Sequence, residues 1–343
     1  MGLKALAGTL MLLLALPATR AAAREQGEPR PRRVILDADP GIDDAMAIVF
    51  ALRSPALEVL GITTVFGNAD IEVGTANALR LVELVGRNVP VARGAAHPLI
   101  QPKAPPPAFV HGADGLGNIA APPPAGKPID ASAAAFIVTT ARLHPGEVTL
   151  VAVGRLTNLA LALALEPRLP ALVKEVVLMG GSAWARGNVT PVAEANIWGD
   201  PHAADIVFGA PWKVTMVGLD VTTRVRLTDD RLRRMAAKDP RVGDFMYRIS
   251  RFYKQFHDST GVSGGFYVHD PSAVAFAIDP SLFSTEPAPV RVVTEGIAIG
   301  QTIAAPGTRA ESWEPSRGRP AVTVCRDVEG ERLLQLFEAT ITP

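Results

Sequence analysis

The chain has 343 residues, of which 48% are hydrophobic, so it is long and apolar enough to build the core of one large α/β enzyme. Lys plus Arg and Asp plus Glu both number 34, and this zero net charge excludes a global basic field for nucleic acid or anionic membranes. The single cysteine, Cys325, excludes an intrachain disulfide and any metal site built from several thiolates.

The first 23 residues have the layout of a secretory signal peptide. Lys4 supplies a positive start, residues 5–16 form an apolar run, and small residues follow at positions 18–23. The run is too short to cross a bilayer comfortably, so we expect cleavage, a secreted or periplasmic protein and no stable membrane association afterwards. A retained N-terminal anchor and a misassigned start codon are the alternatives. Residues 24–32 are predicted to form a flexible lead-in, and residues 33–343 a single domain.

From residue 34 onward, short apolar runs alternate with segments of helical periodicity. The predicted strands cover residues 34–36, 57–65, 148–153, 176–179 and 214–219. The predicted helices cover residues 44–52, 71–85 and 158–165. Strands that alternate with helices in this way imply parallel βαβ crossovers. The sequence therefore predicts an α/β fold with a mostly parallel central sheet and helices on both faces, in a Rossmann-like arrangement.

In such a sheet a ligand binds outside the carboxyl ends of the strands, so the residues that follow each strand are the first candidates for a site. They are Asp37 and Asp39, Thr63-Thr64, Val153-Gly154, Gly180-Gly181 and Asp220. A proline-rich stretch between the second helix and Asp130 is too long for a simple connection. It is either a lid over the site or a mobile surface loop, and its segment around His111 is either part of that lid or a glycine-rich turn.

Four carboxylates crowd the turn between the first strand and the first helix: Asp37, Asp39, Asp43 and Asp44. Like charges at this density are unfavourable unless a cation compensates them, although the helix N-terminus offsets part of the repulsion. Capping and solvation explain one such Asp easily, but not four at the end of a buried strand. We therefore predict a site for a hard cation such as Ca²⁺, which takes about six to eight oxygen ligands.

A second source of ligands is His269-Asp270-Pro271, which precedes another helix-like run. Pro271 suits the first position of that helix, with Asp270 at its cap. Capping alone would also explain this Asp, so the segment is weaker evidence for a cation than the acidic turn.

The segment Asp37-Ala38-Asp39-Pro40-Gly41-Ile42-Asp43-Asp44-Ala45 resembles the N-terminal signature of the inosine–uridine nucleoside hydrolases. Four further segments agree with this family in order and approximate spacing. They are Thr63-Thr64-Val65-Phe66-Gly67-Asn68, Gly154-Arg155-Leu156-Thr157-Asn158, Gly187-Asn188 with Pro191-Val192-Ala193-Glu194-Ala195-Asn196, and His269-Asp270-Pro271. The resemblance covers roughly residues 33–340. It implies a catalytic domain that hydrolyses the N-glycosidic bond of ribonucleosides, with Ca²⁺ as cofactor, to free base and ribose.

The resemblance also implies a role for each matching residue. The calcium ligands would be the side chains of Asp39, Asp44 and Asp270 and the backbone carbonyl of Val153. The ribose diol would be held by Asp43, Asn68 and Asn196, and the 5′-hydroxyl by Asn188 and Glu194. The catalytic residues would be Asp39, as general base on a metal-activated water, and His269, near the departing base. Asp37 would support the turn from behind.

The chemistry is consistent with these residue types. Breaking an N-glycosidic bond passes through an oxocarbenium-like sugar, which nearby carboxylates stabilise. A haloacid-dehalogenase-like phosphotransferase also carries an Asp-x-Asp after its first strand, but the continuation Pro40-Gly41-Ile42-Asp43-Asp44 does not suit it. An exported, non-catalytic nucleoside- or ribose-binding protein on the same fold is the other alternative.

The base side of the site is the least determined. Many family members have an aromatic residue at the position of Ala195, so one packing contact to the nucleoside is in doubt here. Trp184 is a candidate to fill that space or to stack on the base. Phe252, Tyr253, Phe256 and Tyr267 are candidates to line the pocket, although core packing is the better explanation for each aromatic taken alone. Purine or pyrimidine preference stays open, and family members are usually homodimers or homotetramers.

Overall fold

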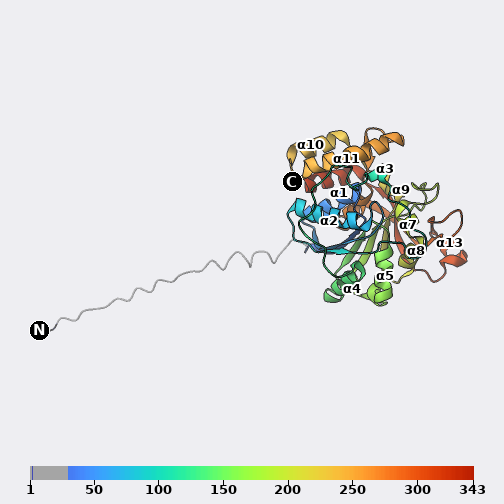
Figure 1. Cartoon of the computed structure of the whole chain (residues 1–343). Coiled ribbons are helices and arrows are strands. Elements are labelled where there is room, and N and C mark those ends of the chain that lie inside the picture. The colour runs from blue at the N-terminus through green and yellow to red at the C-terminus, as the bar shows by residue number, and fades with distance from the viewer. Residues whose placement is uncertain (1, 3–29) are drawn as a thin grey trace. The chain divides into compact units, whose positions relative to one another are not determined.

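The computed structural model describes residue 2 and residues 30–343, of which Arg32–Pro343 form one compact unit (Figure 1). Apart from residue 2, the predicted signal peptide and most of the predicted lead-in lie outside the described residues. Within the described part of the chain, no helix is long and apolar enough to cross a membrane.

A mixed, mostly parallel sheet runs through the unit. Its strands are β1 (Arg32–Ala38), β2 (Leu57–Thr64), β3 (Val91–Arg93), β4 (Thr149–Ala152), β5 (Glu175–Met179), β6 (Val214–Val217), β9 (Phe283–Val292), β10 (Thr302–Ala304) and β11 (Ala321–Val328). They lie in the order β10-β9-β11-β6-β5-β4-β1-β2-β3. Neighbours from β3 to β11 are parallel, whereas β9 runs antiparallel to both β11 and β10. A separate antiparallel pair joins β7 (Arg226–Thr228) to β8 (Gly265–Tyr267).

Helices cover both faces of the sheet (Figure 1). One face carries α1 (Ile42–Arg53), α2 (Ile71–Val85), α10 (Asp229–Lys238), α11 (Val242–Ser259), α12 (His269–Ile278) and α14 (Gly330–Ile341). The other face carries α4 (Ala133–Leu143), α5 (Thr157–Leu165) and α8 (Pro201–Gly209). Shorter helical segments are α3 (Ala108–His111), α6 (Leu169–Leu172), α7 (Ala195–Gly199), α9 (Leu219–Thr222), α13 (Arg309–Ser312), η2 (Pro280–Leu282) and η3 (Glu314–Ser316).

The apolar runs of the sequence explain why the central strands are covered on both sides. Successive side chains of a strand point to opposite faces, and in β1 Val34 and Leu36 pack into one core cluster while Ile35 packs into the other. In β5, Val177 faces the first cluster and Val176 the second. A strand buried on both faces must be apolar throughout, as parallel strands are. The predicted fold class is therefore confirmed.

Most element boundaries differ from the predicted ones by one or more residues, and three of the differences concern the site. Helix α1 begins at Ile42 rather than Asp44, because the Asp44 carboxylate turns back to the start of the helix. Strand β6 ends at Val217, and the next residues form α9 instead of extending the strand. Helix α12 begins at His269, so Asp270 lies in its first turn and is not its cap.

Candidate active site

The turn between β1 and α1 is organised by Asp44. Its two carboxylate oxygens accept hydrogen bonds of 3.0 Å from the backbone N–H groups of Asp39 and Gly41. These bonds satisfy donors at the start of α1 that have no partner within the helix. The side chain is fully buried, so the chain reversal after β1 fixes its carboxylate at the carboxyl end of the sheet.

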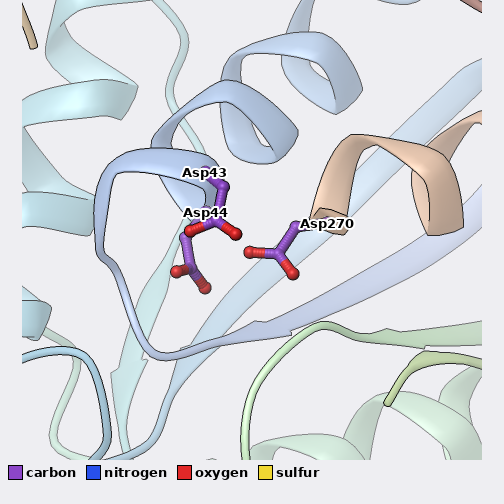
Figure 2. A group of neighbouring side chains, drawn as sticks. All are labelled: Asp43, Asp44 and Asp270. Atoms are coloured by element: carbon purple, nitrogen blue, oxygen red, sulfur yellow. The ribbon is translucent and has the colours of Figure 1, made fainter. Parts of the chain in front are cut away.

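Three buried carboxylates meet at this end. Asp43 and Asp44 come from the first turn of α1, and Asp270 comes from the first turn of α12, which packs against α1 (Figure 2). Asp270 points toward the other two, and each of the three offers an oxygen within 4.8 Å of the others. Oδ1 of Asp43 is buried without a hydrogen-bond partner among the described residues.

This arrangement strongly disfavours three negative charges. Burial, followed by the charge of Asp44, raises the pKa of Asp43 to about 7. Burial, followed by the charges of Asp43 and Asp44, raises the pKa of Asp270 well above its ordinary value. A cation bound by their oxygens would remove both costs, because it replaces repulsion with attraction. Hard oxygen donors and an unpartnered buried oxygen fit Ca²⁺ or another hard divalent ion.

Asp39 is held differently from the other members of the predicted ligand set. Its Oδ2 accepts hydrogen bonds from the Arg155 guanidinium and from the backbone N–H of Asn68, the latter at 2.8 Å. Its Oδ1 is buried and unpartnered among the described residues. Burial raises the pKa of Asp39 well above its ordinary value, and the charge of Arg155 opposes that rise. Asp39 is thus an ion-paired carboxylate with one free oxygen, beside the group formed by Asp43, Asp44 and Asp270.

The backbone carbonyl of Val153, the fourth predicted ligand, accepts a 3.0 Å hydrogen bond from Nδ2 of Asn196. The same Nδ2 donates to the carbonyl of Met179 at 3.1 Å, so Asn196 ties the ends of β4 and β5 together. Asn68 donates from its own Nδ2 to Asp44 Oδ2 at 2.9 Å. Asn68 therefore contacts the acidic turn, and both predicted ribose-binding amides line the cavity.

Asp37, the predicted support of the turn, is the last residue but one of β1. Its Oδ1 accepts hydrogen bonds from the Thr63 hydroxyl at 2.5 Å and from Asn158 Nδ2 at 2.8 Å. Asn158 also donates to the carbonyl of Thr64 and accepts from the backbone N–H of Ala95. Asp37 does not line the cavity, and burial raises its pKa to about 7 despite the two donors.

Glu194 and Asn188, the predicted 5′-hydroxyl ligands, both line the cavity and also hold backbone. Glu194 caps α7 and accepts from the N–H groups of Asn196 and Ile197 at 2.9 and 3.1 Å. Asn188 Oδ1 accepts from the N–H of Ala195 at 3.0 Å. Burial raises the pKa of Glu194, although these backbone donors act against the rise.

Two buried histidines stand on the cavity wall. Nδ1 of His269 lies 2.8 Å from the Thr222 hydroxyl, and burial lowers the pKa of His269 to about 3. Nδ1 of His111 accepts a 3.1 Å hydrogen bond from the N–H of Ile42, which places the loop around His111 over the acidic turn. Burial, followed by the charge of Arg155, lowers the pKa of His111 to about 3 as well. Both imidazoles are therefore neutral near pH 7.

The cavity above these polar groups has a volume of about 760 Å³, which falls within the range of small-molecule sites. Its apolar wall includes Tyr253, Phe256 and Tyr267, together with Pro105–Pro107 and Phe109. The proline-rich stretch therefore contributes to the site. Two candidate aromatics are not part of the lining: Phe252 packs at the edge of the core, and Trp184 stacks on the Arg326 guanidinium at 3.8 Å.

Arg155 was missed by reasoning from the sequence, which gave it no role. It lies just after β4, among the positions where a parallel sheet places its ligands, and a charged residue there is the one available signal. Only the folded chain brings its guanidinium to Asp39.

Comparison with known proteins identifies the family to which the chain belongs. The family model of the inosine-uridine preferring nucleoside hydrolases matches residues 34–335. The chain belongs to this family. It is 40% identical to uridine nucleosidase 1 of Arabidopsis thaliana over 311 residues, which is 90% of this chain and 93% of the relative.

Two solved structures are also similar. A plant nucleoside hydrolase is 39% identical, with a TM-score of 0.87 over 91% of this chain and 99% of the other. A purine-preferring ribonucleoside hydrolase from Gardnerella vaginalis is 36% identical, with a TM-score of 0.84 over 91% of this chain and 98% of the other. The predicted enzyme class, a hydrolase of the N-glycosidic bond of ribonucleosides, is thus confirmed, and the non-catalytic alternative is set aside.

Proposed function

We propose that this nucleoside hydrolase is Ca²⁺-dependent and that the ion is held at the junction of α1 and α12. The observation that carries the proposal is the convergence of three buried carboxylates, Asp43, Asp44 and Asp270. In the described part of the chain, Oδ1 of Asp43 and Oδ1 of Asp39 have no hydrogen-bond partner. When bound, Ca²⁺ would lower the pKa of the attacking water and fix the sugar hydroxyls. The ligands proposed from the family resemblance are the side chains of Asp39, Asp44 and Asp270 and the carbonyl of Val153.

Asp39 is the proposed general base. Its Oδ1 has no hydrogen-bond partner among the described residues and is the oxygen available to the ion and to the attacking water, while Oδ2 is occupied by Arg155 and the N–H of Asn68. The guanidinium favours the ionised carboxylate, which a base requires. Asn68 and Asn196, on the cavity wall, would fix the ribose 2′- and 3′-hydroxyls with Asp43.

His269 is the proposed partner of the departing base. Because burial keeps its imidazole neutral near pH 7, it would donate a hydrogen bond to the base without carrying a charge into the site. The Thr222 hydroxyl beside Nδ1 restrains the ring and so orients Nε2. Glu194 and Asn188, which also line the cavity, would meet the 5′-hydroxyl.

Uridine is the first substrate to test, because the relative with 40% identity is named a uridine nucleosidase. The apolar wall formed by Tyr253, Phe256 and Tyr267 offers surface for a planar base and no charged group that distinguishes one base from another. Since the ribose diol is proposed to meet the ion and the amides, 2′-deoxyuridine should be a poor substrate.

The test is ribose release from uridine, inosine, adenosine and 2′-deoxyuridine by protein stripped with EDTA and then reloaded with Ca²⁺. We expect stripped protein to lose activity and Ca²⁺ to restore it. Full activity in EDTA, after metal analysis shows that no divalent ion remains, would contradict the cation proposal. Equal rates on uridine and 2′-deoxyuridine would contradict the role of the diol.

Two wider proposals concern the chain as a whole. We propose that residues 1–23 direct export and are removed, so that N-terminal sequencing of the secreted or periplasmic protein would begin near residue 24. We also propose that the mature enzyme is a homodimer or homotetramer, which light scattering after size exclusion would test. A protein retained in the cytoplasm at full length would contradict the export proposal. A monomer at micromolar concentration would contradict the proposal of a homodimer or homotetramer.

A further inference from the structure

Arg155 carries a buried positive charge at the acidic site, and the mechanism proposed above uses it only to favour the ionised form of Asp39. The residue is 7% exposed and lines the cavity. Its Nη1 donates to Asp39 Oδ2 and lies 3.3 Å from Asn196 Oδ1 and 3.4 Å from Asn68 Oδ1. One guanidinium nitrogen thus contacts a proposed metal ligand and two proposed ribose ligands.

The surrounding chain leaves room for this side chain at two glycines. A Cβ atom at Gly199 would lie 2.6 Å from both Cγ and Nε of Arg155, and one at Gly67 would lie 2.3 Å from Nη1. The φ of Gly67 is +158°, a value that residues with a side chain rarely adopt, so its backbone favours glycine as well. A side chain at either position would collide with Arg155. The slot around Arg155 is part of the fold and fixes the guanidinium against Asp39.

The placement has a direct electrostatic consequence. Asp39, Asp43, Asp44 and Asp270 are all buried, and Arg155 contacts the first of them. A buried carboxylate without a counter-charge is expensive, so the guanidinium stabilises the protein when no metal is bound. The same positive charge repels a divalent ion at the neighbouring oxygens, and this repulsion is large in a poorly solvated site.

We propose that Arg155 is a permanent counter-cation of the acidic site. Its charge stabilises the folded, metal-free protein and also lowers the affinity of the site for a divalent ion. The inference rests on the proposed function, since it presupposes that the carboxylates bind a cation. Arg155 is in this sense a positioning residue that sets metal affinity through Asp39. A purely structural arginine would affect folding but would leave the affinity for the ion unchanged.

The test measures Ca²⁺ binding by calorimetry and thermal unfolding of EDTA-stripped protein for several variants. Arg155→Gln and Arg155→Met remove the charge, and Arg155→Lys keeps it. The control is Arg319→Met, which breaks a half-buried ion pair with Asp205, and neither member of this pair lines the cavity. We expect both neutral variants to bind Ca²⁺ at least about tenfold more tightly and to unfold at lower temperature without metal. Arg155→Lys should bind within about threefold of the wild-type protein, and Arg319→Met should lower only the unfolding temperature.

Unchanged or weaker Ca²⁺ binding by Arg155→Gln would overturn the inference, as would a tenfold gain in Arg155→Lys. If Arg155→Met folds only when Ca²⁺ is present, that dependence supports the inference, and Arg155→Gln still supplies the affinity. If the wild-type protein itself binds no divalent ion, the proposed function fails first. If the wild-type protein binds Ca²⁺ and the neutral variants bind no better, only this inference fails.

Discussion

The hydroxyl of Tyr253 donates a 3.2 Å hydrogen bond to Oδ2 of Asp43, across 210 residues of chain. Through this bond helix α11, which also supplies apolar wall to the cavity, is connected to the first turn of α1. Among the described residues, Oδ1 of the same carboxylate has no hydrogen-bond partner, so it is available to a ligand. The base side and the acidic side of the cavity are thus joined by one side chain.

Removing this hydroxyl should impair catalysis more than folding. For Tyr253→Phe we expect kcat/KM on uridine to fall about tenfold, because Asp43 loses a donor that holds it in place. The control is Tyr247→Phe on the same helix, whose ring packs under the Arg251 guanidinium at 4.0 Å outside the cavity lining. Steady-state kinetics of both variants decide the matter, and an equal loss in the two would contradict the special role of Tyr253.

The two aromatics that sequence reasoning treated alike should behave differently. Phe256 lines the cavity and packs edge-on against Phe109, with ring centroids 5.8 Å apart. For Phe256→Ala we expect KM for uridine to rise about tenfold, since the base loses apolar contact. Trp184→Ala should leave KM within about twofold, because Trp184 stacks on Arg326 instead. A large effect of Trp184→Ala would place that side chain at the base after all.

Binding of Ca²⁺ should raise the free energy of unfolding of the protein. Ca²⁺ at about one hundred times its dissociation constant should raise the free energy of unfolding by about 2.7 kcal/mol, since it binds the folded state. Asp270→Asn should remove most of this increment, whereas Asp279→Asn, at the exposed C-terminal end of the same helix, should retain it. Urea titrations with and without Ca²⁺ measure both. Full stabilisation of Asp270→Asn by Ca²⁺ would exclude Asp270 from the site.

Another prediction concerns pH and a carboxylate outside the active site. Burial raises the pKa of Asp205, but hydrogen bonds from Arg291 and the N–H of Val292 and the charge of Arg319 together hold it below the ordinary 3.8. A lowered pKa means that the carboxylate stabilises the fold above pH 3.8 and that this contribution is lost as the pH falls through the folded-state value.

For Asp205→Asn we therefore expect a free energy of unfolding about 2–3 kcal/mol lower at pH 7, with the difference shrinking toward pH 3. Urea denaturation at pH 7, 5 and 3 measures it. Asp327→Asn, which removes an exposed pair with Arg224, should stay close to wild type at each pH. A difference for Asp205→Asn that grows on acidification would have the wrong sign.

Local hydrophobic patterns predicted the parallel part of the fold well, because each buried strand and helix has its own periodicity. Helix 71–85 has the bounds that its apolar spacing predicted. The antiparallel edge formed by β9 and β10 went unpredicted, since half-exposed strands such as Phe283–Val292 lack a continuous apolar run. Pairing at a sheet edge depends on partners that are distant in sequence.

The acidic group could be predicted from its residue types. The contacts between residues that are distant in sequence could not. Four carboxylates at one turn signal a cation by themselves, and Asp270 could be suspected as its distant partner. The pairing of Arg155 with Asp39 spans 116 residues and depends on space at Gly67 and Gly199, which no local pattern encodes. For the same reason, Trp184 and Phe256 could not be told apart before the chain was folded.

The central claim is that the N-glycosidic bond is hydrolysed at the acidic turn, where Asp39 acts as the general base. The most direct measurement is the rate of ribose and uracil release from uridine by wild-type protein and by Asp39→Asn, both loaded with Ca²⁺. We predict one ribose per uracil in the wild-type protein and a fall in kcat of about a thousandfold in the variant. Uridine bound without any release of ribose by the wild-type protein, or an unimpaired Asp39→Asn, would contradict the account.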